Sequence, residues 1–265
     1  MSEKSSGKRK AYALLHRLRR GDERHKYNWH MLWFQPAWVA GAYLASNLII
    51  VVLLTILQWL HMPLSSFLRP SIIETVIATL IYALTIAIII FVPRMIRGRF
   101  STDLKTLGLD RLISWTDIGL APVVFLAYIS LLAIVMAFVT AVIPEFPADQ
   151  AQNVGFQAFG MPADNMLAFV TLVVLAPLAE ETLFRGYLYG KLKGYVPAVV
   201  AALVTSLLFA IAHLQWNVGI DVFVLSLFLC GLRSLTGSIW AGVLVHMIKN
   251  GVAYFILFIL PFIGG

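Results

Sequence analysis

Long apolar runs that carry almost no charge constrain this chain more than any other feature. A membrane-spanning helix needs roughly 20 apolar residues, because about 30 Å of hydrocarbon is crossed at 1.5 Å per residue. The sequence contains seven candidate runs, of which the sixth is the shortest. They cover residues 37–60, 72–93, 117–143, 165–190, 196–214, 219–235 and 238–262.

The composition agrees with a protein whose solvent is largely lipid. Hydrophobic residues make up 60% of the chain and charged residues only 12%, whereas soluble domains carry about 25% charged residues. This excludes a disordered chain, a fibrous chain and an ordinary soluble globule. The sequence lacks the alternation of period two that would mark the strands of a membrane barrel. We therefore predict an all-α fold class, a polytopic transmembrane helical bundle.

Positive charge is distributed unevenly between the two sides of the predicted spans. Nine Lys and Arg lie in residues 1–36, five lie between Arg94 and Arg111, and three lie in the turns after the fourth and sixth runs. Only Arg69 falls in a loop on the opposite side. Because positive loops stay in the cytoplasm, we predict a cytoplasmic N-terminus and, with an odd number of spans, a C-terminus outside.

The basic tail 1–36 has two interpretations. Residues Lys8–Arg20 place leucines on one helical face and arginines opposite, as in a helix lying on anionic headgroups, but a solvated tail has the same composition. No nucleic-acid-binding module surrounds the tail, so we expect no nucleic-acid partner. The following apolar run begins too late for a cleaved signal peptide. We divide the chain into this tail, N-terminal transmembrane helices and loops at 37–164, and a membrane core at 165–265.

The fourth run contains three ionisable residues, each costing at least ~2.5 kcal/mol within a bilayer. Glu181 and Arg185 are four residues apart, so they share a helical face and can pair. Glu180 is rotated by about 100° from Glu181, towards Pro177 and Phe184, and neither neighbour can compensate a charge. A salt bridge near a helix end explains Glu181 and Arg185, but it does not explain Glu180.

The fifth and seventh runs each carry a polar group at a helical spacing of four. Phe209 and His213 share a face in the fifth run, and His246 and Asn250 share one in the seventh. Taken by itself, His213 is also consistent with a histidine at the membrane interface that has no catalytic role. His246 and Asn250 also fit an interhelical hydrogen-bond pair, although such bonds average only about 0.6 kcal/mol. Lys249 is rotated away, where it can snorkel or pair with an acid.

Polar groups on three helices can satisfy one another in lipid only if they converge. The convergent site would contain Glu180, His213, His246 and Asn250. A carboxylate tuned by an imidazole suits a general base, while an amide and an imidazole suit donation to an oxyanion. Cys230, the single cysteine, excludes a disulfide framework and a cysteine-based metal site. Since no Ser-His-Asp pattern occurs either, we expect water as the nucleophile and hydrolysis as the reaction.

The motifs around these residues resemble those of the CAAX protease and bacteriocin-processing (CPBP, or Abi) family of intramembrane endopeptidases. They are Glu-Glu-x-x-x-Arg at 180–185, Phe-x-x-x-His at 209–213 and His-x-x-x-Asn at 246–250, in that order. The resemblance covers roughly residues 165–262. It implies a type II CAAX protease-like core that cleaves a peptide within or beside the bilayer.

The same resemblance implies a role for each motif residue. Glu180 would activate the water, with support from His213. The oxyanion would be stabilised by His246 and Asn250. The residues that hold the geometry of the site would be Glu181, Arg185 and Phe209.

A metal ion is an open alternative, because members of this family have been described both as metalloproteases and as metal-independent glutamate proteases. Glu180, His213 and His246 would make a His₂Glu zinc site with an open fourth position. However, these ligands lie on three helices and lack the His-Glu-x-x-His spacing. We therefore expect no obligatory metal.

The expected partners are membrane lipid and a peptide or membrane-protein substrate, in the plasma membrane of a prokaryote. Another class of function is a non-catalytic membrane scaffold or bacteriocin self-immunity protein. A proton-coupled transporter would also bury Glu and His, but no inverted repeat is found. Residues 215–217 fit either a water entrance or a plain interfacial loop, and the loop 144–164 fits a lid.

Overall fold

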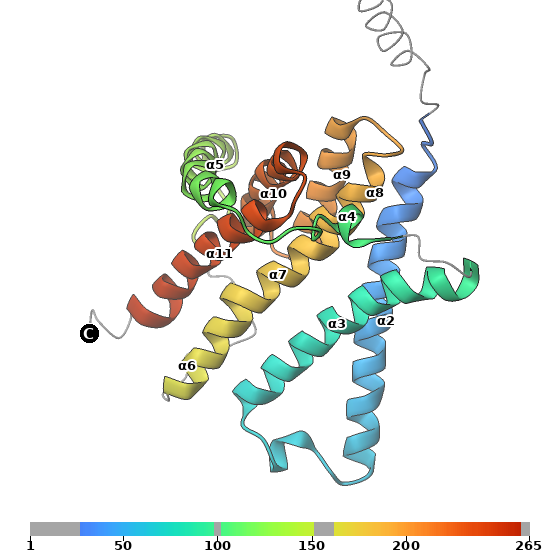
Figure 1. Cartoon of the computed structure of the whole chain (residues 1–265). Coiled ribbons are helices and arrows are strands. Elements are labelled where there is room, and N and C mark those ends of the chain that lie inside the picture. Colours follow the sequence, from blue (N-terminus) through green and yellow to red (C-terminus); the bar gives the residue numbers. More distant parts are fainter. Residues whose placement is uncertain (1–26, 98–101, 151–161, 261–265) are drawn as a thin grey trace, which may run out of the picture.

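The computed structural model describes residues 27–97, 102–150 and 162–260, and no strand occurs in these ranges (Figure 1). The all-α fold class is therefore confirmed. The α-helices are α2 (Met31–Trp59), α3 (Pro70–Arg97), α4 (Leu104–Leu107), α5 (Trp115–Val142), α6 (Pro162–Phe169), α7 (Ala176–Glu181), α8 (Gly190–Leu192), α9 (Ala198–Ile211), α10 (Trp216–Thr236) and α11 (Trp240–Tyr254). A 3₁₀ turn, η1 (Leu64–Ser66), and three π-helical segments, η2 (Val170–Leu175), η3 (Thr182–Tyr189) and η4 (Phe255–Ile259), complete the elements.

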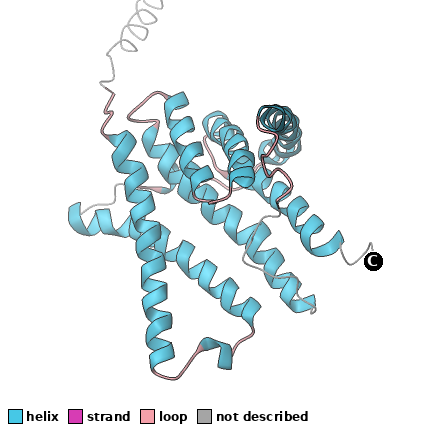
Figure 2. Ribbon diagram, turned by 180° about the vertical axis from the view of Figure 1, so that it is seen from behind, coloured by secondary structure: helices cyan, strands magenta, loops and turns pink. Residues whose placement is uncertain are grey.

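Six helices in the described residues are long and apolar enough to cross a membrane. They are α2, α3, α5, the continuous helix Pro162–Leu192, α10 and the helix Trp240–Ile259. These helices match six of the seven predicted runs, so the chain is an integral membrane protein. Figure 2 shows the same bundle from behind, with α2 and α3 diverging from each other at one end.

The predicted spans 196–214 and 219–235 are corrected in length. The first forms only the 14-residue α9, about 21 Å long at 1.5 Å per residue, which is too short to span the bilayer alone. It begins after Pro197 and ends before Leu214, whose φ is +53°. The second, expected to be the shortest, is the 21-residue α10, because its helix extends outward to Trp216 and Thr236.

Two sequence predictions fall in parts of the chain that are not described. The interfacial helix at Lys8–Arg20 lies outside the described residues, and so do residues 151–161 of the proposed lid. The first span is described and starts at Met31, six residues before its predicted boundary, with Pro36 inside the helix.

The helix that carries Glu180 is wound unevenly. From α6 to α8 it is continuous, but π-helical winding occupies η2 and η3 on either side of α7. Such segments are rare in proteins and occur frequently at functional sites. Pro177 lies at the start of α7, where the missing N–H leaves an upstream carbonyl without its intrahelical donor.

Hydrogen bonds hold α3 beside this uneven helix. Ser71 Oγ donates to Asp164 Oδ1 at 2.6 Å, and Thr171 Oγ1 donates to Thr75 Oγ1 at 3.1 Å. A further bond of 3.0 Å joins Thr85 on α3 to Ser46 on α2. The N-terminal helices are therefore attached along the helix that carries the motif glutamates.

The segment 102–115 packs against the same helix from outside the predicted spans. Gly186 and Gly190 face this segment closely. A Cβ at Gly186 would lie 2.8 Å from the Leu107 carbonyl oxygen, and a Cβ at Gly190 would lie 2.9 Å from the Thr106 carbonyl oxygen. Asp103 caps α4, and hydrogen bonds from the Thr106 hydroxyl and backbone N–H lower the pKa of the Asp103 carboxyl. This contact fixes the end of the helix that follows the motif glutamates.

Candidate active site

Glu181 and Arg185 form the expected pair on the fourth predicted span. The distance from Arg185 Nη1 to Glu181 Oε1 is 2.7 Å, and both side chains are fully buried. Gly242 on α11 makes room for this carboxylate, since a Cβ there would lie 3.0 Å from Glu181 Oε2. The prediction that the two residues pair on one helical face is confirmed.

Glu180 points away from that pair, as its position on the helix requires, and finds a partner on α3. Tyr82 donates its hydroxyl hydrogen to Glu180 Oε1, with an O···O distance of 2.5 Å. The other carboxylate oxygen, Oε2, lies 3.7 Å from His246 Nε2. The Glu180 side chain is 16% exposed, so it is not sealed within the core as Glu181 is.

His246 lies between the two motif glutamates. Its Nδ1 is 3.0 Å from Glu181 Oε1, while its Nε2 faces Glu180. A carboxylate on one ring nitrogen fixes the orientation of the imidazole and the direction of the other nitrogen. The arrangement therefore aims His246 Nε2 at the same space that Glu180 Oε2 faces.

Phe209 contacts the rings of both His213 and His246. The Phe209 centroid lies 4.9 Å from that of His213 and 5.9 Å from that of His246, in edge-to-face geometry. The Arg185 guanidinium lies over the same Phe209 ring at 4.4 Å, a cation–π distance. Phe209 is 1% exposed, and it therefore locates the two imidazoles relative to the buried ion pair.

His213 lies close to the glutamates without a hydrogen bond to them among the described residues. Its Nδ1 is 2.8 Å from the Phe209 carbonyl oxygen. The side chains of Glu180, Lys249 and His246 lie within electrostatic range of its ring. The backbone bond fixes the ring at the end of α9 and leaves Nε2 as its second polar atom.

Asn250 makes a backbone contact that the sequence did not suggest. Its Nδ2 donates to the Leu172 carbonyl oxygen at 2.9 Å. In π-helical winding that carbonyl would accept from residue 177, and residue 177 is proline, which has no N–H. One amide hydrogen of Asn250 therefore replaces the missing backbone donor, while the second remains on the same nitrogen.

The metal-dependent alternative would need Glu180, His213 and His246 to converge on one ion. In residues 27–97, 102–150 and 162–260, no group of three or more His, Cys, Asp or Glu side chains is placed to hold a metal ion. The Phe209 ring contacts both imidazoles.

Comparison with known families adds an independent observation. Residues 162–252 match a family model described as type II CAAX prenyl endopeptidase Rce1-like. We call residues 162–252, which are similar to this family, the Rce1-like segment. It contains every residue of the three motifs, from Glu180 to Asn250. The Rce1-like segment also includes α9 and α10, whereas Tyr82 lies outside it.

A curated relative of this chain is a protein of Escherichia coli that is described as an uncharacterized 24.3 kDa protein. It is 40% identical over 92 residues, which cover 32% of this chain and 41% of the relative. The match therefore spans less than half the length of that relative. No solved structure matches the chain.

Lys249 was expected either to snorkel or to pair with an acid, and it pairs with an acid. Its Nζ lies 3.3 Å from Asp221 Oδ2 on α10, and the hydroxyl of Tyr128 on α5 donates to Asp221 Oδ1. The three residues link α5, α10 and α11 within the predicted spans. Lys249 lies on a different face of α11 from His246 and Asn250, and on that face it pairs with Asp221.

Proposed function

We propose that this protein is an intramembrane endopeptidase that hydrolyses a peptide bond of a peptide or membrane-protein substrate. One observation carries the proposal: Glu180 Oε2 and His246 Nε2, from separate membrane helices of the Rce1-like segment, face each other across 3.7 Å. That spacing exceeds a direct hydrogen bond. Both atoms can reach one water molecule or substrate atom that lies beside the pair.

In the proposed reaction, Glu180 is the general base. Its Oε2 takes one proton from water while the water oxygen bonds to the carbonyl carbon of the scissile peptide. As the C–N bond breaks, Glu180 returns the proton to the leaving amine, so that the carboxylate is regenerated. His213, held by its bond to the Phe209 carbonyl, supports the water from the end of α9.

The developing oxyanion is assigned to His246 and Asn250. His246 is oriented by Glu181, which is itself paired with Arg185. The second amide hydrogen of Asn250 is the other proposed donor, since the first is used on Leu172. Donors held in place before the reaction lower the barrier most effectively. We therefore assign Glu181 and Arg185 to positioning and not to the chemistry itself.

The substrate is unidentified, so the direct test of the proposal is an experiment that identifies it. Membrane proteomes of cells that contain the wild-type protein or Glu180→Ala would be compared by peptide mass spectrometry. We expect fragments of at least one membrane protein or peptide with the wild type, and the intact precursor with Glu180→Ala. A non-catalytic scaffold or self-immunity protein would leave both proteomes the same, and Glu180→Ala would retain its biological effect.

Tyr82 provides a further prediction for the same reaction. The Tyr82→Phe variant keeps the ring but removes the hydrogen bond to Glu180 Oε1. This bond fixes the orientation of the Glu180 carboxylate, and misplacement of a reacting group can cost about 100-fold in rate, so we expect kcat to fall by roughly 10- to 100-fold. Steady-state cleavage of the identified substrate measures this change. Tyr27→Phe, at an exposed tyrosine, serves as the matched control, and equal rates for both variants would remove Tyr82 from the mechanism.

Metal removal should have little effect on cleavage. In the proposed reaction the base is Glu180 and the donors are side chains of this chain, so no step uses a metal ion. Purified protein treated with EDTA or 1,10-phenanthroline should keep its rate within about twofold, a change of less than ~0.5 kcal/mol in the barrier. Loss of activity that added Zn²⁺ restores would instead favour the His₂Glu arrangement.

The distribution of Lys and Arg along the chain indicates how the protein lies in its membrane. We infer a plasma-membrane protein of a prokaryote with its N-terminus in the cytoplasm, because 17 of the 20 Lys and Arg residues lie on the predicted inner side. The core 165–265 would carry the motif residues, and the helices within 37–164 would contribute Tyr82.

A further inference from the structure

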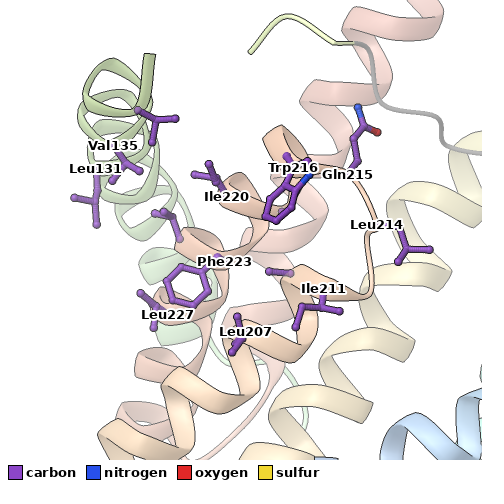
Figure 3. Close-up of a pocket in the computed structure, with 14 residues that line it drawn as sticks. Leu131, Val135, Leu207, Ile211, Leu214, Gln215, Trp216, Ile220, Phe223 and Leu227 are labelled. Carbon is purple, nitrogen blue, oxygen red and sulfur yellow. The ribbon is translucent and has the colours of Figure 1, made fainter. Parts of the chain in front are cut away.

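An apolar cavity of about 780 Å³ lies between α5, α9 and α10 (Figure 3). This volume is within the range of roughly 300–1,000 Å³ that is usual for small-molecule sites. The α5 wall consists of Leu131, Val135 and Val139. The other residues around it are Leu207, Ala210, Ile211, Leu214, Gln215, Trp216, Gly219, Ile220, Phe223, Val224 and Leu227. Apart from the residues at its polar end, the lining is hydrocarbon.

The cavity is separate from the candidate active site but shares a wall with it. On one side of α9, the Phe209 ring contacts the Arg185 guanidinium and His213 lies within electrostatic range of Glu180. Ala210 and Ile211 lie on another side of the same helix and line the cavity, since successive residues are rotated by about 100°. None of the motif residues that we assign to the reaction is among the lining residues.

The length of the cavity matches one leaflet of a membrane. In Figure 3, Trp216, Ile220, Phe223 and Leu227 follow one another along α10. At 1.5 Å per residue, Trp216 and Leu227 are about 16 Å apart along the helix axis. Half of a hydrocarbon core of about 30 Å is about 15 Å. With Trp216 at the membrane interface, the apolar wall would extend to approximately the middle of the bilayer.

The two ends of the cavity differ in polarity. At the start of α10, Gln215 and Trp216 form one end, and Asn217 beside them donates to the Gln150 carbonyl oxygen at 2.7 Å. Trp216 is 81% exposed, and exposed tryptophan is typical of the interface between hydrocarbon and headgroups. The end at Phe223 and Leu227 is lined by apolar side chains.

The cavity is also continuous with the surface that faces lipid. Large apolar side chains on the outer face of α5, including Leu126, Ile134 and Phe138, are exposed, and in a membrane protein such a face contacts hydrocarbon chains. Leu131, which lines the cavity, is itself exposed at 40%. An apolar cavity does not hold water stably, whereas an acyl chain can enter it from the adjoining leaflet without leaving a hydrocarbon environment.

We propose that this cavity binds one acyl chain of a membrane glycerophospholipid, with the headgroup at the end formed by Gln215 and Trp216. A chain in this position packs on the side of α9 opposite Phe209 and His213. The bound lipid would therefore support the helix that carries one of the two motif histidines. This site is independent of the peptidase chemistry, and it would remain if Glu180 proved not to be a base.

The test uses a phosphatidylcholine that carries a photoreactive diazirine midway along one acyl chain. The full-length protein is reconstituted in vesicles of phosphatidylethanolamine and phosphatidylglycerol with a small share of this probe, irradiated and analysed by peptide mass spectrometry. We expect cross-links to be enriched at lining residues such as Phe223 and Val224 relative to the exposed Phe138.

Cavity-filling variants make the test specific. Ala210→Trp on α9 and Val135→Trp on α5 fill the cavity from different walls. If one variant fails to fold, the other can still be measured. Either should reduce cross-linking of the lining by at least about fivefold, equivalent to ~1 kcal/mol of lost affinity. Ala133→Trp, at an exposed α5 position outside the lining, should leave it unchanged.

Two results would overturn the proposal. One is cross-linking of the lining that is no stronger than that of Phe138, or that survives both filling variants. The other is loss of lipid cross-links when a cleavable substrate is added, which would make the cavity part of the substrate site. Glu180→Ala should give the wild-type cross-linking pattern, so failure of the proposed peptidase activity is recognised separately.

Discussion

Glu180→Gln should lower the cleavage rate by about 10²- to 10⁴-fold, the usual contribution of a positioned general base. The amide has nearly the same shape as the carboxylate, and its oxygen can still accept the hydrogen bond from Tyr82. It cannot take a proton from water at neutral pH. The fold should therefore be preserved while kcat is lost, as measured by cleavage of the identified substrate in detergent or in vesicles.

Glu145→Gln is the matched control for this variant. Glu145 is an exposed glutamate in the loop after α5, and its neutralisation should leave cleavage unchanged. If Glu180→Gln cleaved as fast as Glu145→Gln, another group would have to be the base, and the proposed mechanism would be wrong even if the protein remained a protease.

Arg185→Met should have the largest effect on stability. Both side chains of the Arg185–Glu181 pair are fully buried, so removal of the cation leaves a carboxylate without its charge partner. Breaking a buried pair in this way typically costs about 3–5 kcal/mol. Reversible unfolding in mixed detergent micelles, followed by circular dichroism, measures the loss of free energy of unfolding.

An exposed ion pair provides the comparison for this variant. Arg69 bonds to Asp164 at 2.9 Å, but the Arg69 side chain is 42% exposed, and such pairs contribute only about 0–1 kcal/mol. Arg69→Met should therefore have a much smaller effect. The double variant Glu181→Gln/Arg185→Met should recover part of the lost stability, because it removes the uncompensated charge. Equal losses for Arg69→Met and Arg185→Met would contradict the assignment of a buried structural pair.

The spans and the buried pair could be predicted because each has a local cause. A run of about 20 apolar residues is sufficient to span the bilayer, and a spacing of four places Glu181 and Arg185 on one helical face. The convergence of Glu180 with His246 could be inferred from the cost of unpaired polar groups in lipid. None of these inferences required knowledge of how the helices are arranged.

Other features depend on contacts between distant segments and had no such signal. Tyr82 lies in an uncharged run, and Glu180 is 98 residues away, so nothing in the local pattern connects them. The bond from Asn250 to the Leu172 carbonyl depends on π-helical winding near Pro177. A reading based on 3.6 residues per turn does not anticipate that winding. The end of α9 was also missed, because apolar residues continue past it to Leu214.

The Asp221–Lys249 pair, with Tyr128, has a consequence for how the protein is made. A lone charge at the centre of a membrane helix costs about 2.5–3.5 kcal/mol on insertion scales, and α10 and α11 each carry one member of this pair. Since only three residues separate these helices, they can leave the translocon together as a hairpin with opposite charges already matched. The hairpin would then insert without an unpaired charge, and Tyr128 on α5 would add its hydrogen bond to Asp221 as the helices pack.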